Sequence, residues 1–312
     1  MNKPQFTIVI PMYNRQREIR RALESCLAQD FTDFEIVVVD DASDDDSVAA
    51  ASAYCDLRIK VVCHATNRGE CPARNTGVAS SRGEWIVFLD SDHALMPGSL
   101  SVIHRYIVQE SEDIGRLGFM FKFDTGECSP DPAPDCSVWD YEGWLRFAQT
   151  ARLSDTLLCT RHSTFRTVPL TDSRVAPTEY NLEFAHNFKT RLIPVVLAIQ
   201  YTDSANRLTA NRVRSGRASI LLRASDDVAS SERMLRNHGN ALRRHAPRPY
   251  EVIYRRLVLA NFVGGKWFVG VRLAFGYLWS CRPTFNGLAS IAVAAVWPTA
   301  FLAARDWKAR RA

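Results

Sequence analysis

Several patterns that mark common protein classes are absent from this chain of 312 residues. None of its eight cysteines forms a Cys-x-x-Cys pair, which excludes zinc-finger ligand spacing. The glycine-rich phosphate loops of dinucleotide oxidoreductases and of P-loop enzymes are also missing. With only 15 Gly and 14 Pro, the chain is not collagen-like, and 46% hydrophobic residues are typical of an ordered globular protein.

Acidic residues are scarce in the last third of the chain. Residues 1–204 contain 20 Lys and Arg against 29 Asp and Glu, a net charge of −9, whereas residues 205–312 contain 19 against 5, a net charge of +14. We therefore predict two regions, 1–205 and 206–312, with different roles. Because residues 1–5 lead directly into a strand-like run, we expect no signal peptide and reduced cysteines facing the cytoplasm.

Short apolar runs alternate with amphipathic stretches in the first region. Near-continuously apolar strands joined by helices predict an α/β fold, a mostly parallel sheet with helices on both faces. The expected strands are 6–10, 34–39, 58–62, 85–89, 117–123, 156–160 and 192–200. The expected helices are 15–29, 46–54, 71–80, one after Pro97-Gly98, 139–151 and 179–189, and 124–138 is expected to be a loop.

Acidic pairs follow two of the expected strands. Asp40 and Asp41 end the strand 34–39, and Asp90 and Asp92 follow 85–89. In parallel sheets, ligands bind outside the carboxyl ends of the strands. Two carboxylates there suit Mg²⁺ or Mn²⁺, although an Asp-rich turn with solvated charges has the same sequence.

Two further features of this edge fit a phosphorylated ligand. Asp40 or Asp41 can accept a hydrogen bond from a base or a ribose, although either can also cap a helix. Arg74, in the segment that joins the third strand to its helix, can bind a diphosphate through its planar fork, or it can be an ordinary surface arginine.

Four segments in order resemble the motifs of the family 2 glycosyltransferases, which have the GT-A fold. They are Ile8–Asn14, Val38–Asp45, the stretch 67–77 and Phe88–Asp92. The resemblance covers about the first 110 residues, which it implies bind the nucleotide sugar, while 111–205 bind the acceptor. It also implies a divalent metal and inversion at the anomeric carbon.

The same resemblance implies roles for single residues. Pro11 and Tyr13 would line the base pocket, with Asp41 as the base-contacting acid and Asp40 beside it. Arg74 would approach the diphosphate, Asp90 would serve donor and metal, and Asp92 the metal. Two positions depart from the family pattern: Ala42 replaces the usual glycine, and His93 stands where an acid is frequent. We expect His93 to be an exposed turn residue, with a weak extra metal ligand as the alternative.

Family members carry a further carboxylate that acts as the catalytic base, commonly in a Glu-Asp pair, and this pair is missing here. Glu179, which opens the helix before the last strand, is our predicted base. Glu183 and Asp172 are the alternatives, and a first-turn acid that stabilises the helix dipole would also explain Glu179.

The basic region 206–312 mixes arginines with aromatic residues, and no charged residue occurs from 283 to 304. We predict helices that lie in the membrane surface, held by anionic headgroups, with a transmembrane segment near 283–304 or a soluble helical subdomain as the alternatives. We expect no nucleic-acid partner, because no binding motif accompanies the charge.

The sequence thus predicts an inverting, metal-dependent glycosyltransferase at the cytoplasmic side of the plasma membrane, peripheral or monotopic. It would transfer a sugar, with UDP-sugar as the expected donor, to a lipid-linked or polysaccharide acceptor in bacterial surface-polysaccharide synthesis. The alternatives are a non-catalytic nucleotide-sugar binding or assembly protein and a nucleotidyltransferase. The latter lacks its glycine-rich, basic loop at Pro11–Asn14.

Overall fold

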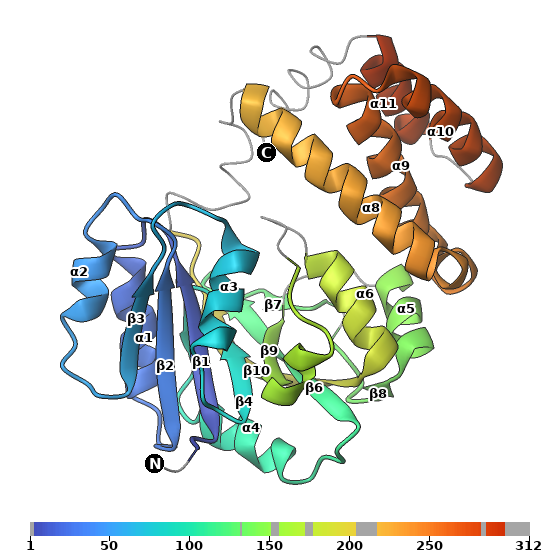
Figure 1. Ribbon diagram of the computed structural model, residues 1–312. Coiled ribbons are helices and arrows are strands. Elements are labelled where there is room, and N and C mark those ends of the chain that lie inside the picture. Colours follow the sequence, from blue (N-terminus) through green and yellow to red (C-terminus); the bar gives the residue numbers. More distant parts are fainter. Residues whose placement is uncertain are drawn as a thin grey trace. The chain divides into compact units, whose positions relative to one another are not determined.

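The computed structural model describes residues 3–131, 133–150, 156–171, 177–203, 217–281 and 285–296 (Figure 1). The chain forms two compact units. The first comprises Met1–Trp144 and Ala151–Ser204, and the second comprises Leu145–Thr150 and Ala205–Ala312.

A mixed sheet of ten strands is the centre of the first unit. Its strands are β1 (Phe6–Met12), β2 (Phe34–Asp40), β3 (Ile59–Cys63), β4 (Trp85–Phe88), β5 (His93–Leu95), β6 (Ile114–Phe123), β7 (Cys128–Ser129), β8 (Val138–Trp139), β9 (Leu157–Arg161) and β10 (Lys189–Gln200). The order is β3-β2-β1-β4-β9-β6-β10-β5, with β7 beside β6 and β8 beside β10. The neighbours β3, β2, β1 and β4 are parallel, whereas β9 runs antiparallel to both β4 and β6.

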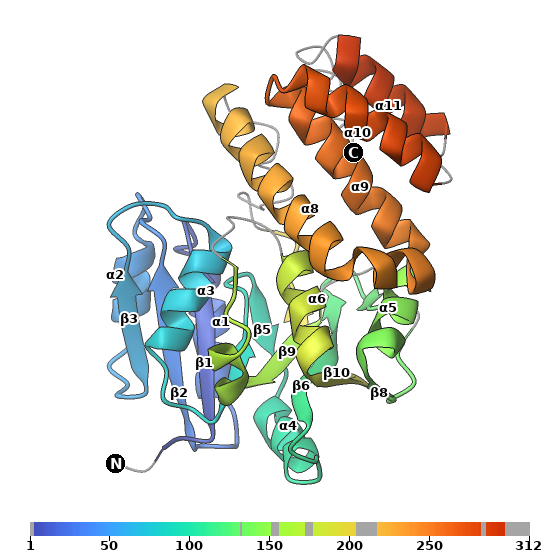
Figure 2. The ribbon, with the colours of Figure 1, turned by 45° about the vertical axis from the view of Figure 1, so that its right-hand side comes forward.

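Helices cover both faces of this sheet. They are α1 (Glu18–Leu27), α2 (Ser47–Ser52), α3 (Glu70–Ala79), α4 (Ser99–Ile107), the 3₁₀ helix η1 (His162–Arg166) and α6 (Pro177–Asn187), while α5 (Tyr141–Thr150) is divided between the two units. Successive strand residues point to opposite faces. Ile8 and Ile10 of β1 therefore pack with α1, α2 and α4, whereas Val9 and Phe88 pack with α3, η1 and α6. Figures 1 and 2 show α3 and α6 on the same side of the sheet.

The predicted fold class is confirmed, and every strand expected in the first 110 residues is present. Several features were not predicted. They include β5 directly after the acidic turn, β7 within the expected loop 124–138, β8 where the expected loop meets the expected helix 139–151, and the antiparallel insertion of β9 between β4 and β6.

The described part of the second unit includes the helices α8 (Arg217–His245), α9 (Pro247–Val263), α10 (Trp267–Ser280) and α11 (Phe285–Val296). Its core joins Val258 and Phe262 of α9 to Tyr277 of α10 and to Ile291 and Ala294 of α11. Within the described ranges, every helix falls short of the length or the apolarity that crossing a bilayer requires. Of the uncharged run 283–304, only α11 is described, and the remainder lies outside the described residues.

Candidate functional site

The predicted site residues Pro11, Asp40 and Asp90 lie at the carboxyl ends of three adjacent parallel strands, β1, β2 and β4. Backbone hydrogen bonds continue this edge beyond the strands. Asp41 N–H donates to the Met12 carbonyl at 2.8 Å, and Leu89 N–H donates to the Val9 carbonyl at 3.1 Å. The loops that follow the three strands are therefore held together.

The loops after β1 and β2 are joined by side-chain contacts. Asn14 N–H donates to Ser43 Oγ at 2.9 Å, and Asp44 N–H donates to Asn14 Oδ1 at 3.0 Å. Asn14 and Ala42 both adopt left-handed backbone conformations, with φ of 53° and 61°. This fixed turn leaves the Tyr13 side chain 43% exposed, so its ring is available to a planar ligand.

Asp41 is buried and organises the start of α3. Its carboxylate lies 2.8 Å from His64 Nδ1 and accepts hydrogen bonds from the backbone N–H groups of Arg68, at 2.9 Å, and Gly69, at 2.7 Å. The opposite ring nitrogen of His64 lies 2.8 Å from Thr76 Oγ1. Asp41 therefore connects the end of β2 to α3.

Asp40 has a different environment from its neighbour. Its side chain is only 2% exposed, and Oδ2 accepts a hydrogen bond from Ser43 N–H at 3.1 Å. Oδ1 is buried and has no hydrogen-bond partner among the described residues. Of the two predicted donor-binding acids, Asp40 thus has a buried carboxylate oxygen without a hydrogen-bond partner among the described residues, whereas Asp41 was the one expected to contact the base.

Arg74 projects from α3 toward the end of β4. Its Nη2 donates to Asp90 Oδ1 at 2.7 Å and lies 2.8 Å from Glu70 Oε1, and its guanidinium carbon is 5.3 Å from the centre of the Phe88 ring. Burial alone would raise the pKa of Asp90, but the charges of Arg74, His93 and Arg15 and the hydrogen bond from Arg74 together outweigh it, and the pKa is lowered. Asp90 is therefore ionised at neutral pH.

The position of α3, and hence of Arg74, depends on Gly77. A Cβ atom on Gly77 would lie 2.3 Å from Val9 Cγ1 of β1, far closer than two carbon atoms can approach. The absence of a side chain lets the helix pack directly on the strand. Arg74, three residues earlier in α3, is thereby brought within hydrogen-bonding distance of Asp90.

Asp90, Asp92 and His93 form a cluster whose candidate ligand atoms all lie within 4.8 Å of one another. The expectation that His93 is an exposed turn residue was wrong. His93 belongs to β5, is 7% exposed, and its ring packs against that of Phe121 at 5.4 Å. Two carboxylates and an imidazole nitrogen are donors that fit a divalent cation such as Mn²⁺.

The predicted base lies in the first turn of α6, where Glu179 is 6% exposed. Arg116 of β6 fixes this helix, because its Nη1 donates to Asn181 Oδ1 at 2.8 Å and its guanidinium carbon lies 3.7 Å from the centre of the Phe184 ring. Both contacts come from within two turns of Glu179, so the helix start is rigidly placed.

Aromatic contacts connect the first turn of α6 to the end of β4. Tyr180 stacks on Phe165 at 6.2 Å, and Phe165 meets Phe88 edge to face at 5.9 Å. The charge of Arg74 also acts on the Tyr180 hydroxyl, whose pKa burial raises. A row of aromatic rings thus joins the first turn of α6 to Phe88, next to which the guanidinium of Arg74 lies.

The alternatives to Glu179 are placed differently. Glu183 lies one turn further along α6, and burial together with the Glu183 charge raises the pKa of Tyr141 in α5 to about 12. Its electrostatic neighbour is thus a tyrosine of another helix. Asp172 lies outside the described residues.

Two further residues of this edge, Arg15 and His64, were not predicted from the sequence. Arg15 is 8% exposed, and its positive charge contributes to lowering the pKa of Asp90. His64 bridges Asp41 and Thr76. An arginine after a strand-ending turn and a histidine after a strand carry no pattern that would mark them, because their roles come from contacts with distant segments.

Comparison with known proteins adds an independent finding. Residues 7–127 match the model of glycosyl transferase family 2. The succinoglycan biosynthesis protein ExoO of Rhizobium meliloti is 43% identical over 97 residues, which cover 31% of this chain and 28% of ExoO. A GalNAc(5)-diNAcBac-PP-undecaprenol β-1,3-glucosyltransferase of Campylobacter jejuni is 37% identical over 103 residues, 32% of this chain and 33% of that protein. These alignments span about a third of each relative.

Solved structures with the same fold match most of the chain. S. aureus TarS 1–349 in complex with UDP-GlcNAc has a TM-score of 0.57 and 17% identity, covering 82% of this chain and 81% of TarS 1–349. The Pyrobaculum calidifontis mannosyltransferase PcManGT, in complex with GDP-Man and Mn²⁺, has a TM-score of 0.51 and 18% identity, covering 99% and 88% of the two chains. At these identities the likeness shows a shared fold.

Proposed function

We propose, from the match of residues 7–127 to the model of glycosyl transferase family 2, that this protein is an inverting glycosyltransferase that moves a sugar from a nucleotide-sugar donor to an acceptor hydroxyl. The observation that carries the proposal is the convergence of Asp90, Asp92 and Arg74 at one strand edge. Carboxylates for a divalent cation and a guanidinium for a diphosphate are what the departure of a nucleoside diphosphate requires. We assign this reaction to residues 1–205.

The donor half of the site would work as follows. Tyr13 and Pro11 flank the base, and a carboxylate of the Asp40-Asp41 pair accepts its hydrogen bond. Arg74 binds the diphosphate and stabilises the charge that develops as the bond to the sugar breaks. Asp90 and Asp92 would hold Mg²⁺ or Mn²⁺, which neutralises the departing diphosphate when bound.

Glu179 would act on the acceptor. Its carboxylate takes the proton from the acceptor hydroxyl while that oxygen attacks the anomeric carbon, on the face opposite the leaving diphosphate. Burial of Glu179 and the fixed start of α6 support this role, because a base must be held within hydrogen-bonding distance of the proton it removes.

Relatives support the choice of substrates. The TarS structure is a complex with UDP-GlcNAc, and the C. jejuni relative is named for an undecaprenol-linked acceptor. We accordingly propose a UDP-sugar donor and a lipid-linked or polysaccharide acceptor, in the assembly of a bacterial surface polysaccharide.

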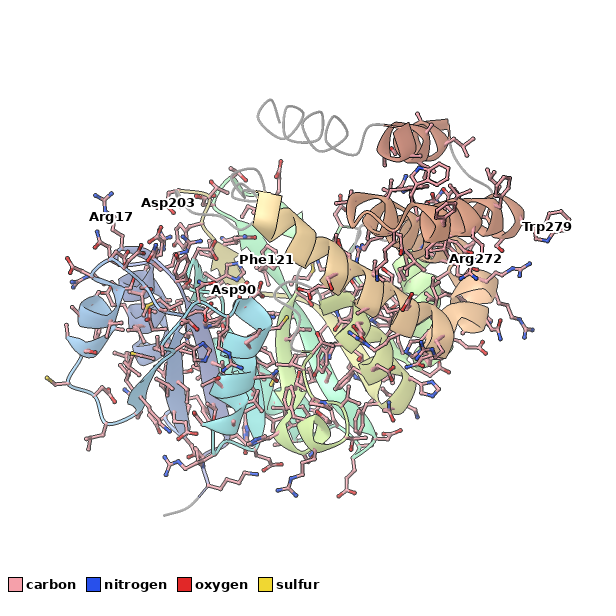
Figure 3. The ribbon with its side chains drawn as sticks, turned by 45° about the horizontal axis from the view of Figure 1, so that its top comes forward. Arg17, Asp90, Phe121, Asp203, Arg272 and Trp279 are labelled. Carbon is pink, nitrogen blue, oxygen red and sulfur yellow. The ribbon has the colours of Figure 1, made fainter. Side chains whose placement is uncertain are left out.

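We further propose that the second unit, within residues 206–312, binds the cytoplasmic surface of the membrane. One face of α10 carries five exposed apolar side chains, at 49–92% exposure: Trp267, Phe268, Phe275, Leu278 and Trp279. Arg272 is exposed on the same helix, and Figure 3 shows Trp279 projecting away from the helices of this unit. No acidic residue occurs between Glu251 and Asp306. Exposed tryptophans beside basic residues are typical of an interfacial helix on anionic lipid.

The enzymatic proposal is tested with a panel of nucleotide sugars. The full chain is incubated with each donor and a membrane lipid extract, with and without Mn²⁺ or Mg²⁺, and transfer and donor hydrolysis are both measured. Asp92→Ala is the matched variant. Metal-dependent turnover that Asp92→Ala lacks would support the proposal.

Other results would favour the alternatives. Donor binding without turnover by the wild-type protein would favour the non-catalytic binding protein. Release of pyrophosphate from a nucleoside triphosphate and a sugar phosphate would favour the nucleotidyltransferase.

A further inference from the structure

His93 has a feature that its packing does not explain. The side chain is 7% exposed, and its Nε2 atom is buried without a hydrogen-bond partner among the described residues. A buried imidazole nitrogen without a partner costs free energy, because folding removes the water that would otherwise bind it. The nitrogen lies 3.6 Å from Asp92 Oδ1, so it points into the acidic cluster.

The imidazole is held in this position from several sides. The backbone of β5 pairs with β10, with His93 opposite Gln200, and His93 N–H donates to the Asp90 carbonyl at 2.9 Å. Phe121 packs against the ring at 5.4 Å. A ring fixed in this way does not need to move far to meet an ion between Asp90 and Asp92.

The spacing of the donor atoms suits one cation. Ligand atoms at about 2.0–2.2 Å from an ion can be separated from one another by at most about twice that distance. The candidate atoms of Asp90, Asp92 and His93 lie within 4.8 Å of one another, close to that limit. Small side-chain rotations would bring all three onto a single ion.

We propose that His93 Nε2 is the third protein ligand of the divalent cation, and that it makes the site prefer Mn²⁺ to Mg²⁺. This inference rests on the proposed function, which places a cation at Asp90 and Asp92. Mg²⁺ binds oxygen ligands and accommodates nitrogen poorly, whereas imidazole is an ordinary ligand for first-row transition metals. His93 would thus determine which metal serves the donor site.

The test measures metal binding by the full chain in the presence of UDP. Mn²⁺ affinity is determined by electron paramagnetic resonance, Mg²⁺ affinity by competition, and nitrogen coordination by the electron spin-echo modulation of bound Mn²⁺. We expect wild-type protein to show a directly bound ¹⁴N nucleus. His93→Leu should lose that signal and weaken Mn²⁺ binding by at least about tenfold, with little effect on Mg²⁺.

Two further variants make the result specific. His93→Asp restores a ligand but supplies oxygen, so we expect cation binding to return with the preference shifted toward Mg²⁺. His104→Leu is the matched control, because its imidazole is also packed against a phenylalanine, Phe31 at 5.0 Å, away from the cluster. His104→Leu should change neither the Mn²⁺ affinity nor the Mg²⁺ affinity.

The spectrum of the wild-type protein decides the question even where His93→Leu fails to fold. Bound Mn²⁺ without nitrogen modulation, or an unchanged Mn²⁺-to-Mg²⁺ preference in folded His93→Leu, would overturn the inference while leaving metal-dependent transfer intact. A wild-type protein that binds neither cation would instead refute the metal site of the proposed function, and the inference with it.

Discussion

Arg74 Nη2 donates a 2.7 Å hydrogen bond to Asp90 Oδ1, so the carboxylate that would meet the metal is already paired with a cation. The same guanidinium lies 2.8 Å from Glu70 of its own helix. Arg74 therefore orients Asp90 and keeps a positive charge beside the place where the donor diphosphate would lie. This arrangement requires the close packing of α3 on β1 at Gly77.

We predict that Arg74→Gln lowers kcat by about 10²–10³, because it removes a preorganised charge from the departing diphosphate. The measurement is kcat at saturating donor and metal. Glu70→Gln is the control, since it leaves the Arg74–Asp90 hydrogen bond intact and should cost less than about tenfold. Equal losses in the two variants would show that the whole salt-bridge network, and not the Arg74 charge, is what matters.

Glu179→Gln should lower kcat/KM by about 10²–10⁴, as expected for the loss of a general base, while the donor affinity stays close to that of the wild type. Glu183→Gln removes a carboxylate one turn along the same helix and is the matched comparison. Transfer rates and donor affinity are measured separately for both. A large decrease in kcat/KM for Glu183→Gln together with a small decrease for Glu179→Gln would identify Glu183 as the catalytic base.

The parallel part of the fold could be predicted from the sequence because its strands are buried on both faces and carry near-continuous apolar runs, as in Ile36–Val39. The position of β9 could not. A run such as Leu157–Arg161 fits an interior strand in either direction, and its insertion between β4 and β6 is determined by contacts with segments far along the chain.

The residues of the candidate site likewise include some that could be predicted from the sequence and some that could not. Asp40 and Asp90 could be found because strand ends are visible in the sequence. The burial of His93 could not, because it depends on the pairing of β5 with β10 at Gln200 and on the ring of Phe121. The contrast between Asp40, with a spare buried oxygen, and the fully engaged Asp41 likewise appears only when the 67–69 loop folds over Asp41.

Membrane binding should depend on the exposed face of α10. We expect Phe268→Ser with Trp279→Ser to weaken co-sedimentation with anionic vesicles by at least about tenfold, since each side chain would lose its burial in the lipid interface. Leu57→Ser with Val108→Ser, which removes two exposed apolar side chains from the first unit, is the control. Binding that is unchanged by the α10 variant, or equal for neutral and anionic vesicles, would refute this surface.

The free energy of unfolding should decrease at acidic pH, partly because Glu35 becomes protonated. Burial alone would raise the pKa of Glu35, but hydrogen bonds from Thr7 and Arg82 outweigh it and the pKa is lowered from 4.5. A carboxyl whose pKa is lower in the folded state stabilises the protein above its unfolded pKa, and this contribution disappears as the pH falls through the folded pKa.

Glu35→Gln should therefore reduce the free energy of unfolding by about 1–2 kcal/mol at pH 7, and the difference from wild type should shrink below pH 4.5. Urea unfolding between pH 3 and 7 measures this. Glu112→Gln, a substitution at an exposed position, should leave the pH dependence of the free energy of unfolding the same as in the wild type. A constant difference between Glu35→Gln and wild type across this range would mean that the effect is one of packing and not of charge.

Ala42 adopts φ of 61°, a left-handed conformation that costs an L-residue roughly 1–2 kcal/mol. Glycine avoids this cost but loses about 0.4–1 kcal/mol through the greater freedom of the unfolded chain. Ala42→Gly should therefore stabilise the protein by up to about 1.6 kcal/mol in thermal or urea unfolding. Ala49→Gly, at an exposed position inside α2, is the same substitution in helical backbone and should destabilise by about 0.5–1 kcal/mol. Opposite signs for the two variants would show that the turn after Asp41 stores backbone strain, and a loss of stability in both would show that Ala42 is unstrained.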